Sequence, residues 1–182
     1  LFSLLEELPD IIDEGVWIAG GAIRKTILGE ALNTDIDFFF RSREVFEWFK
    51  NELVALGATL EGKTDHQETY EYYSFNLYEA FKLQLITIDF YENVLELLDS
   101  FDFTICQFAY DGVDLYCGKY SLWDLSRKRL AIHKITYAIP SLRRIIKYSK
   151  QGFYACSGFL TEFLNEVVNN PETIDEEILY ID

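Results

Sequence analysis

The spacing of apolar and polar residues near the N-terminus predicts one compact unit of secondary structure. Val16–Ala19 is a short apolar run, as expected for a buried strand. Gly20 and Gly21 end this run, because glycine lets the backbone turn tightly and approach a ligand closely. Residues 22–28 have helical character, and residues 35–40 lead into an apolar second strand. We therefore expect a strand, a turn, a helix and a strand in that order.

Helical and extended patterns continue to alternate along the rest of the chain. Apolar residues recur at three- and four-residue spacing over residues 43–56, and Ser42 precedes them as a plausible N-cap. Residues 70–78 and 82–90 predict two antiparallel strands joined by a short turn at residues 79–80. The other expected elements are a helix over 1–8, a strand starting at 59–60, a loop over 61–68, a helix over 92–98, a helix after Pro140 and a last helix over 157–169.

These elements predict an α+β fold, with a small mixed sheet flanked by helices and a short helical part at the C-terminus. The 182 residues are enough for one domain with a proper core and a short appendage. We expect a head domain over residues 1–135 and a short, neck-like helical segment over residues 136–182. The missing initial Met indicates a trimmed or partial chain.

Composition adds an expectation about location. No apolar run is as long as a membrane span, and no secretory signal pattern stands at the start. Cys106, Cys117 and Cys156 have no metal-type spacing, so we interpret them as reduced, small buried residues. Together these features predict a cytoplasmic protein without a membrane partner.

Asp35 and Asp37 are the strongest chemical signal in the chain. Side chains at positions i and i+2 of a strand lie on the same face, so these carboxylates project together while Ile36 and Phe38 point the other way. Neighbouring carboxylates repel each other and are costly to desolvate, and a divalent cation is the usual reason to keep them. Oxygen ligands of this kind suit Mg²⁺, which commonly binds one or two carboxylates together with substrate phosphates.

The turn at Gly20 and Gly21 adds a second signal. A helix that starts at such a turn presents free N–H groups, which form a ready phosphate site. A phosphate site and a carboxylate pair within one strand–turn–helix–strand unit predict nucleotide chemistry. The alternative for the Gly-Gly pair alone is an ordinary turn.

The same stretch resembles a known family. Gly20-Gly21, thirteen further residues and then Asp35-Ile-Asp37 resemble the signature of the DNA polymerase beta-type nucleotidyltransferase superfamily. The fuller form, which includes Arg24, is similar to motif A of the head domain of class II tRNA CCA-adding enzymes and bacterial poly(A) polymerases. Asp89 ends an apolar run and resembles the third carboxylate of such folds, or it caps the helix expected over residues 92–98.

Two later segments extend this resemblance over residues 16–150. Residues 101–112 resemble motif B, whose core reads Arg-Arg-Asp-Phe-Thr-Ile-Asn-Ala, and Asp102 occupies its Asp position. The segment after Pro140 resembles motif D, in which an Arg and an acidic residue read the incoming base. Arg144 is the match by spacing, with Arg143 as the alternative, and a solvated basic helix face is the other interpretation.

The resemblance implies a polymerase beta-like palm and a nucleotidyltransferase that moves NMP from an NTP, such as ATP, to an acceptor hydroxyl, an RNA 3′ end in the family. It implies catalytic, metal-binding carboxylates that hold two Mg²⁺ ions, and residues that bind the nucleotide. The implied carboxylates are Asp35, Asp37 and Asp89, and the implied nucleotide-binding residues are Gly20, Gly21, Arg24, Asp102 and Arg144.

Several departures from the family pattern support a rival hypothesis. Ser100 and Phe101 replace the Arg pair before Asp102, and neither can form the bidentate bonds that Arg makes to phosphate. Cys106 replaces the family Asn, and Lys25 replaces the Asp after the motif A Arg. The rival is a degenerate head domain that binds a nucleotide or a partner protein without turnover.

The charge of the chain bears on the acceptor. Its net charge is −15, whereas proteins that bind nucleic acid normally display a basic face, because counterion release drives their affinity. This charge repels polyanions on average and disfavours an RNA acceptor. A protein hydroxyl or a small molecule is therefore a serious alternative acceptor.

Overall fold

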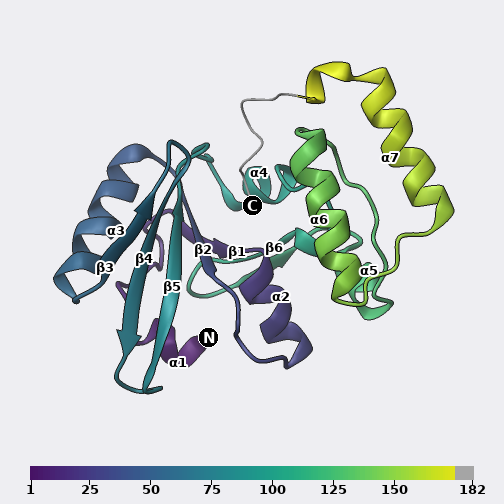
Figure 1. Ribbon diagram of the computed structural model, residues 1–182. Helices are drawn as coiled ribbons and strands as arrows, with labels where there is room; N and C mark the ends of the chain where they lie inside the picture. Colours follow the sequence, from purple (N-terminus) through teal and green to yellow (C-terminus); the bar gives the residue numbers. More distant parts are fainter. Residues whose placement is uncertain (175–182) are drawn as a thin grey trace. The chain divides into compact units, whose positions relative to one another are not determined.

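The computed structural model, which describes residues 1–174, is a mixed α+β fold built on one sheet (Figure 1). The seven strands lie in the order β3-β4-β5-β2-β1-β6-β7, and their pairing is mostly antiparallel. The predicted fold class is confirmed. The strands are β1 (Val16–Ala19), β2 (Ile36–Phe40), β3 (Thr59–Lys63), β4 (Gln67–Ser74), β5 (Glu79–Ile86), β6 (Phe108–Tyr110) and β7 (Leu115–Cys117). The α-helices are α1 (Phe2–Leu5), α2 (Gly21–Leu28), α3 (Arg43–Ala55), α4 (Val94–Asp99), α5 (Ser121–Ser126), α6 (Ala138–Lys150) and α7 (Ser157–Asn169), with 3-10 turns η1 (Thr104–Cys106) and η2 (Pro171–Thr173).

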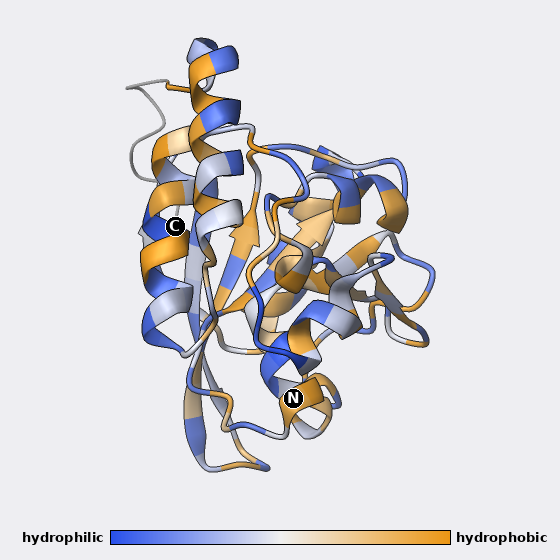
Figure 2. Cartoon of the chain, turned by 90° about the vertical axis from the view of Figure 1, so that its right-hand side faces the viewer, coloured by the Kyte–Doolittle hydropathy of each residue, from blue (hydrophilic) through white to orange (hydrophobic). Residues whose placement is uncertain are grey.

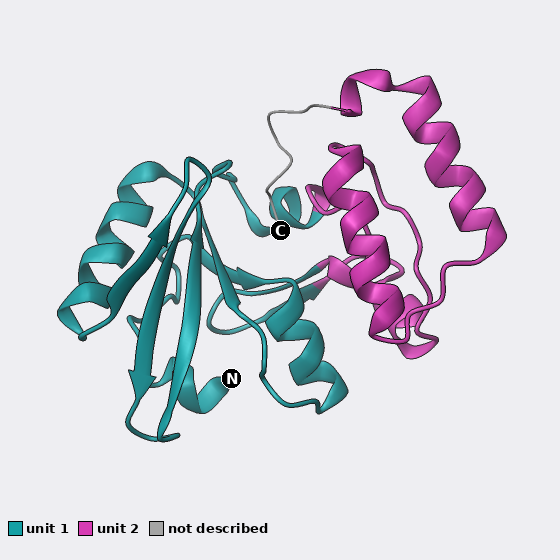
Figure 3. Cartoon of the chain, in the orientation of Figure 1, with its two compact units in different colours: residues 1–98, 108–116 teal, residues 99–107, 117–182 magenta. Residues whose placement is uncertain are grey.

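The chain divides into two compact units (Figure 3). The first comprises Leu1–Leu98 and Phe108–Tyr116. The second comprises Asp99–Gln107 and Cys117–Asp182, of which residues up to Ile174 are described. The chain passes from one unit to the other several times, and the division expected after residue 135 stays a prediction.

The core of the first unit forms where β2 meets α3. Ile36, Phe38 and Phe40, at alternating positions that share one face of the strand, are fully buried. The Phe38 ring lies 4.9 Å from that of Phe49, and the Phe40 ring lies 5.4 Å from that of Phe46, measured between centroids. Such aromatic pairs contribute beyond the area that they bury. This packing sets which face of β2 is turned away from the core.

Helix α3 begins and ends close to the predicted positions. The Ser42 Oγ accepts a hydrogen bond from the Val45 N–H at 3.3 Å, which confirms the predicted N-cap. Helix α2 is also close to its predicted range, and Gly29 ends it in the left-handed conformation with φ +66°. Helix α7 spans the predicted residues, whereas α1 is shorter than the helix expected over 1–8.

The predicted boundaries of the β4–β5 hairpin are wrong. The strands run over 67–74 and 79–86, so the turn lies at 75–78 rather than at 79–80. Strand β3 also extends to Lys63 as an exposed edge strand, so most of the loop expected over 61–68 is extended. Asp89 consequently lies beyond the end of β5.

A carboxylate far away in sequence explains the position of this turn. Glu7 accepts hydrogen bonds from the Ser74 hydroxyl and from the N–H groups of Phe75 and Asn76, at 2.8 and 3.2 Å for the two amides. The bond from Ser74 is the main cause that lowers the pKa of Glu7 below its ordinary value. Local sequence pattern cannot reveal a turn stabilised from residue 7.

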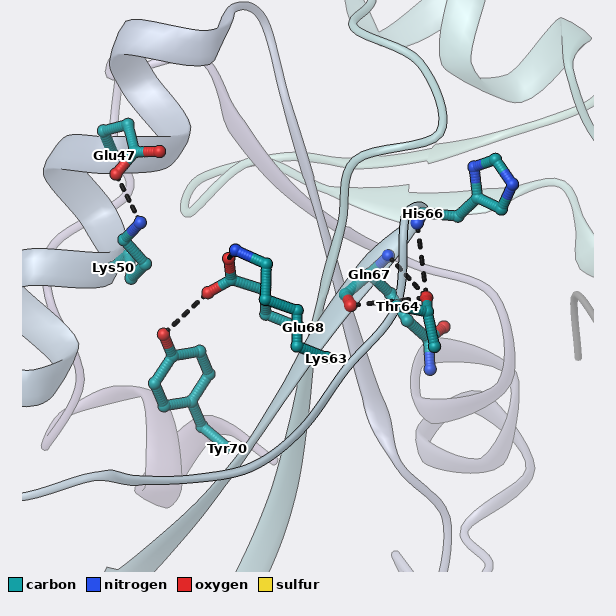
Figure 4. A network of polar contacts seen from close by, with 8 residues as sticks. All are labelled: Glu47, Lys50, Lys63, Thr64, His66, Gln67, Glu68 and Tyr70. Atoms are coloured by element: carbon teal, nitrogen blue, oxygen red, sulfur yellow. Dashed lines mark hydrogen bonds and ion pairs between the residues drawn. The ribbon is translucent and has the colours of Figure 1, made fainter.

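Strand β4 also carries a buried acid, Glu68, inside the layer of core residues. Lys63 Nζ lies 2.7 Å from its Oε1, and the Tyr70 hydroxyl donates to its Oε2 at 2.8 Å (Figure 4). Burial raises the pKa of Glu68, but the bonds from Lys63 and Tyr70 lower it by more than burial raises it. The pKa therefore lies below its ordinary value. Burial together with the bond to Glu68 raises the pKa of the Tyr70 hydroxyl.

The second unit is built from η1 and the helices α5, α6 and α7. The Phe103 ring packs against Tyr148 of α6 and Phe159 of α7, with centroids 6.1 and 6.0 Å apart. The helices carry hydrophilic and hydrophobic residues on different sides, as Figure 2 shows by colour. Cys106 is buried, but Cys117, at the end of the short strand β7, is exposed and Cys156 is half-buried, so the prediction of three buried cysteines holds only for Cys106.

Within the described part of the chain, no helix has both the length and the apolar character that crossing a bilayer requires. The cytoplasmic location stays a prediction.

Glu68 generates a prediction about acid stability. A carboxylate whose pKa is lowered in the folded state stabilises the fold above the unfolded pKa, and this contribution is lost as the pH falls through the folded pKa. Glu68→Gln should therefore reduce the free energy of unfolding by about 1–2 kcal/mol at pH 7, because Lys63 and Tyr70 lose a charged acceptor. The deficit should shrink as the pH falls below 4.5, the ordinary pKa of the group.

Urea unfolding of both proteins between pH 3 and pH 7 measures this difference. Glu71→Gln is the matched control, because Glu71 is exposed on the same strand. Parallel stability curves for Glu68→Gln and Glu71→Gln would contradict the assignment.

Candidate functional site

The Gly-Gly turn joins the end of β1 to the start of α2. Gly20 has φ +76°, a conformation that residues with a Cβ rarely adopt, and its N–H donates to the Phe108 carbonyl at 3.0 Å. Gly21 is the first residue of α2, and the helix has neither a side-chain cap nor an acidic residue in its first turn. A Cβ on Gly21 would lie 3.5 Å from Thr34 Oγ1, at ordinary contact distance. The turn therefore brings the start of α2 beside the residue before Asp35.

The cations of α2 lie on either side of this turn. Arg24 is buried, and its Nη2 lies 4.0 Å from the point that a Cβ on Gly21 would occupy. Lys25 Nζ donates to Asn33 Oδ1, within the loop that leads to β2. Lys25, which replaces the Asp of the family pattern, thus holds the loop before Asp35.

Asp35 and Asp37 lie at the beginning of β2, next to the end of β1. Asp37 pairs with Ala19, the residue before Gly20, so the carboxylate pair and the Gly-Gly turn share one end of the sheet. Both carboxylate residues are half-buried, whereas Ile36 between them is fully buried. The alternation predicted from the sequence therefore brings the two aspartates to the face opposite the core.

Gln84 of β5 joins this face. Strands β2 and β5 are parallel, and their register pairs Asp37 with Gln84. The Gln84 Nε2 donates a hydrogen bond to Asp35 Oδ2 at 2.8 Å. Sequence reasoning missed Gln84, although its position between the apolar residues Leu83 and Leu85 already placed it on the polar side of a strand.

Lys82 lies two residues before Gln84, and acidic neighbours determine its charge state. Its Nζ lies 3.1 Å from Glu61 Oε2. The hydrogen bond and attraction from Glu61 raise the pKa of Lys82, and Asp35 adds to this effect. The cation nearest to the carboxylate pair along β5 is thus already paired with a glutamate.

Asp89 does not join the pair as the sequence suggested. It is exposed, and its Oδ1 accepts a hydrogen bond from the Phe90 N–H at 2.8 Å. Across residues 1–174, the His, Cys, Asp and Glu side chains form no group of three or more that could hold a metal ion. The structure therefore brings together two of the three predicted metal-binding carboxylates.

Asp102 and Arg144 lie in the second unit, where they bond to each other. The Arg144 Nη1 donates to Asp102 Oδ2 at 2.9 Å, and the Ser141 hydroxyl donates to the same oxygen at 2.8 Å. Burial lowers the pKa of Arg144, but attraction to Asp102 and the hydrogen bond outweigh it, so the pKa lies above its ordinary value. These predicted nucleotide-binding residues thus contribute to holding α6 onto the segment before η1.

Two other residues of this region also have internal partners. Cys106, which stands where the family has Asn, lies with its Sγ 3.1 Å from the Tyr148 hydroxyl. The Thr104 hydroxyl donates to the buried Asp124 at 2.7 Å. Residues 102–106 therefore organise the core of the second unit through polar contacts.

The ion pair between Asp102 and Arg144 predicts a loss of stability when it is broken. Asp102→Asn should lower the free energy of unfolding by about 2–3 kcal/mol, less than for a fully enclosed pair because part of Arg144 stays exposed. Thermal unfolding of the purified variant measures this loss. Lys147→Ala, which removes an exposed cation one turn further along α6, should change stability by no more than about 0.5 kcal/mol. Equal effects of the two substitutions would refute a structural role for the pair.

Comparison with solved structures shows the nucleotidyltransferase-like fold. A CCA-adding enzyme with ATP has a TM-score of 0.64 at 17% identity over 98% of this chain and 48% of its own. A tRNA nucleotidyltransferase with a primer tRNA and an ATP analogue has a TM-score of 0.61 at 18% identity over 91% of this chain and 50% of its own. A tRNA-processing enzyme in an apo form has a TM-score of 0.60 at 21% identity over 85% of this chain and 42% of its own. The chain thus spans half or less of the length of these proteins.

Sequence comparison adds a family. No curated protein matches the chain. Residues 2–128, which are more than half of the chain, match the family model of the Gabija anti-defense 2 proteins, Gad2. The chain therefore belongs to the Gabija anti-defense 2 family.

Proposed function

We propose that this chain is a Mg²⁺-dependent nucleotidyltransferase that moves NMP from an NTP to an acceptor hydroxyl and thereby serves an anti-defense role. One observation carries the proposal: Asp35 and Asp37 share the face of β2 opposite Ile36 and Phe38, beside the Gly-Gly turn that starts α2. The nucleotidyltransferase-like fold and the family support it. We also propose that the chain is related in particular to the head domains of CCA-adding enzymes and poly(A) polymerases.

The donor set at this face fits Mg²⁺. Asp35 and Asp37 offer hard carboxylate oxygens, and Gln84, which donates a hydrogen bond to Asp35, carries no charge of its own. In our proposal Asp35 and Asp37 would hold the ion, which would supply activation of the attacking hydroxyl and stabilisation of the pyrophosphate leaving group. A second ion, and a part for Asp89 in binding it, stay predictions from the sequence.

The start of α2 is the proposed phosphate site. Its first N–H groups have no side-chain cap, and the partial positive charge of the helix N-terminus favours an anion there. The absence of a Cβ at Gly21 leaves room for a phosphate to approach the backbone. Arg24 contributes positive charge from beneath the turn, as a buried residue, rather than from the open surface.

Local charge bears on the acceptor. Residues 59–86, which form β3, β4 and β5, contain two lysines against five acidic residues, and both Lys63 and Lys82 are paired with glutamates. A polyanion would find no basic track along these strands. We therefore favour a protein hydroxyl as acceptor, within the Gabija system that the family name points to, over the RNA 3′ end that the resemblance implies.

The second candidate function is a binding module without turnover. Asp102 and Arg144, which the resemblance assigns to the nucleotide, bond to each other, and Cys106 contacts Tyr148. This would leave nucleotide binding to the first unit and favour recognition of a partner protein. Loss of NMP transfer with retained nucleotide binding would distinguish this candidate from the enzyme.

A transfer assay tests the proposal. The chain is incubated with each of the four α-labelled NTPs and Mg²⁺, together with the Gabija proteins, with bulk tRNA, or alone. Label should move to a Gabija protein in the wild type, and Asp35→Asn with Asp37→Asn should reduce the rate by roughly a thousandfold or more, because the ion loses its ligands. Asp65→Asn, an exposed carboxylate between β3 and β4, should leave the rate unchanged.

The three acceptor arms give different conclusions. Label on tRNA would support the nucleotidyltransferase activity but contradict the protein acceptor. No transfer in any arm would reject the enzyme and favour the binding module.

A pair of glycine substitutions separates binding from folding. Gly21→Ala should leave stability within about 0.5 kcal/mol, because its Cβ meets Thr34 Oγ1 at ordinary distance and Ala suits a first helical turn. It should nevertheless weaken NTP binding at least about tenfold by filling the approach to the backbone. Gly29→Ala should leave NTP affinity unchanged but lower stability, since an alanine at φ +66° costs about 1 kcal/mol of strain at the far end of α2. Calorimetric NTP titration and thermal unfolding of both variants measure the two effects, and unchanged NTP affinity in Gly21→Ala would reject the phosphate site.

A further inference from the structure

Three polar side chains, those of Asp35, Asp37 and Gln84, lie together at the candidate metal site, and among residues 1–174 no third acid completes a metal-binding group with them. Asp37 and Gln84 are register partners on parallel strands, so their side chains leave the sheet on the same face. Asp35, two residues before Asp37, receives the Gln84 Nε2 hydrogen bond on its Oδ2 at 2.8 Å. Gln84 thus stands beside both carboxylates, in a position where another acidic side chain would also meet them.

We propose that Gln84 is a positioning residue for the metal site, an inference that rests on the proposed function. Its amide N–H groups hold one oxygen of Asp35 and leave the other oxygen, Oδ1, for a cation. Its amide carries no charge, so the site has two negative charges where a glutamate would make three. A divalent cation then binds weakly to the protein alone and tightly only when nucleotide phosphates add ligands and charge.

The neighbours of Gln84 support an electrostatic role rather than a packing role. Gln84 is half-buried on the polar side of β5, whereas the residues on either side of it, Leu83 and Leu85, are fully buried in the core. Lys82 on the same side of β5 is engaged by Glu61, so it does not neutralise the carboxylates by direct contact. The partner of Gln84 on β4 is Thr69, which is uncharged. A carboxylate at position 84 would therefore place a third acidic side chain next to Asp35 and Asp37.

Metal titration provides a readout that does not depend on turnover. Mn²⁺ is titrated into the full chain and followed by electron paramagnetic resonance, with and without a non-hydrolysable NTP analogue, for wild type, Gln84→Glu and Gln84→Ala. Gln84→Glu should bind Mn²⁺ roughly tenfold more tightly than wild type without nucleotide. Gln84→Ala should weaken Mn²⁺ binding roughly tenfold in the presence of the analogue, because Asp35 loses its restraint.

A matched control separates local ligation from general charge. Thr69→Glu adds the same charge on the same face, one strand further from Asp37. It should change Mn²⁺ affinity by less than about twofold, since the added charge lies one strand further away and cannot ligate the ion. Thermal unfolding verifies that each variant is folded, and Mn²⁺ should raise the melting temperature of Gln84→Glu more than that of wild type.

The outcomes separate this inference from the proposed function. If wild type transfers NMP but Gln84→Glu binds Mn²⁺ no more tightly than wild type or Thr69→Glu, the inference is overturned while the function stands. If wild type shows no transfer but Gln84→Glu acquires Mn²⁺ binding, position 84 faces the cation and only the function falls. If neither wild type nor Gln84→Glu binds Mn²⁺, the inference is overturned as well.

Discussion

The burial of one face of β2 against α3 is the constraint on which the rest of the first unit depends. Ile36, Phe38 and Phe40 fill the core, and a shift of one residue in register would exchange them for Asp37 and its neighbour on the opposite face. Burying an unpaired carboxylate costs far more than a single aromatic contact provides, so the register is strongly determined. The packing of a hydrophobic core therefore also determines where the two carboxylates project, without any ligand to direct them.

The second unit shows a different use of charged residues. Asp102 lies under α6 and receives bonds from Ser141 and Arg144, while Thr104 bonds to Asp124. A buried pair of this kind stabilises only if both partners stay in place, because a lone buried charge is costly. Asp102 and Arg144, which the resemblance assigns to nucleotide binding, thus also help to hold the short 3-10 turn η1 in place. The internal bonds of Asp102 and Arg144 thus give both residues a structural role that does not depend on a nucleotide.

Much of this arrangement could be predicted because it is local. The three- and four-residue spacing of apolar residues and the capping residues define α3 and α7. The alternation of polar and apolar residues around Asp35 and Asp37 predicts that these two carboxylates share a face. The β4–β5 boundary could not be predicted, because Glu7 stabilises that turn from a distant part of the chain. Asp89 lies beyond the strand rather than at its end, because β5 ends at Ile86. Gln84 escaped notice because an amide in a strand carries no chemical signal until the parallel pairing with β2 brings it beside Asp35.

Charge connects the site to the biology of the family. The chain combines a nucleotidyltransferase-like fold with a net charge of −15, and the lysines of β3 and β5 are paired with glutamates. A long RNA would lose affinity on such a surface, whereas one nucleotide with its metal ion brings its own counter-charge. A small charged substrate at a two-carboxylate site and an acceptor that is not a polyanion satisfy both constraints together. The chain belongs to the Gabija anti-defense 2 family, and a protein acceptor is therefore the hypothesis that our proposed function adopts.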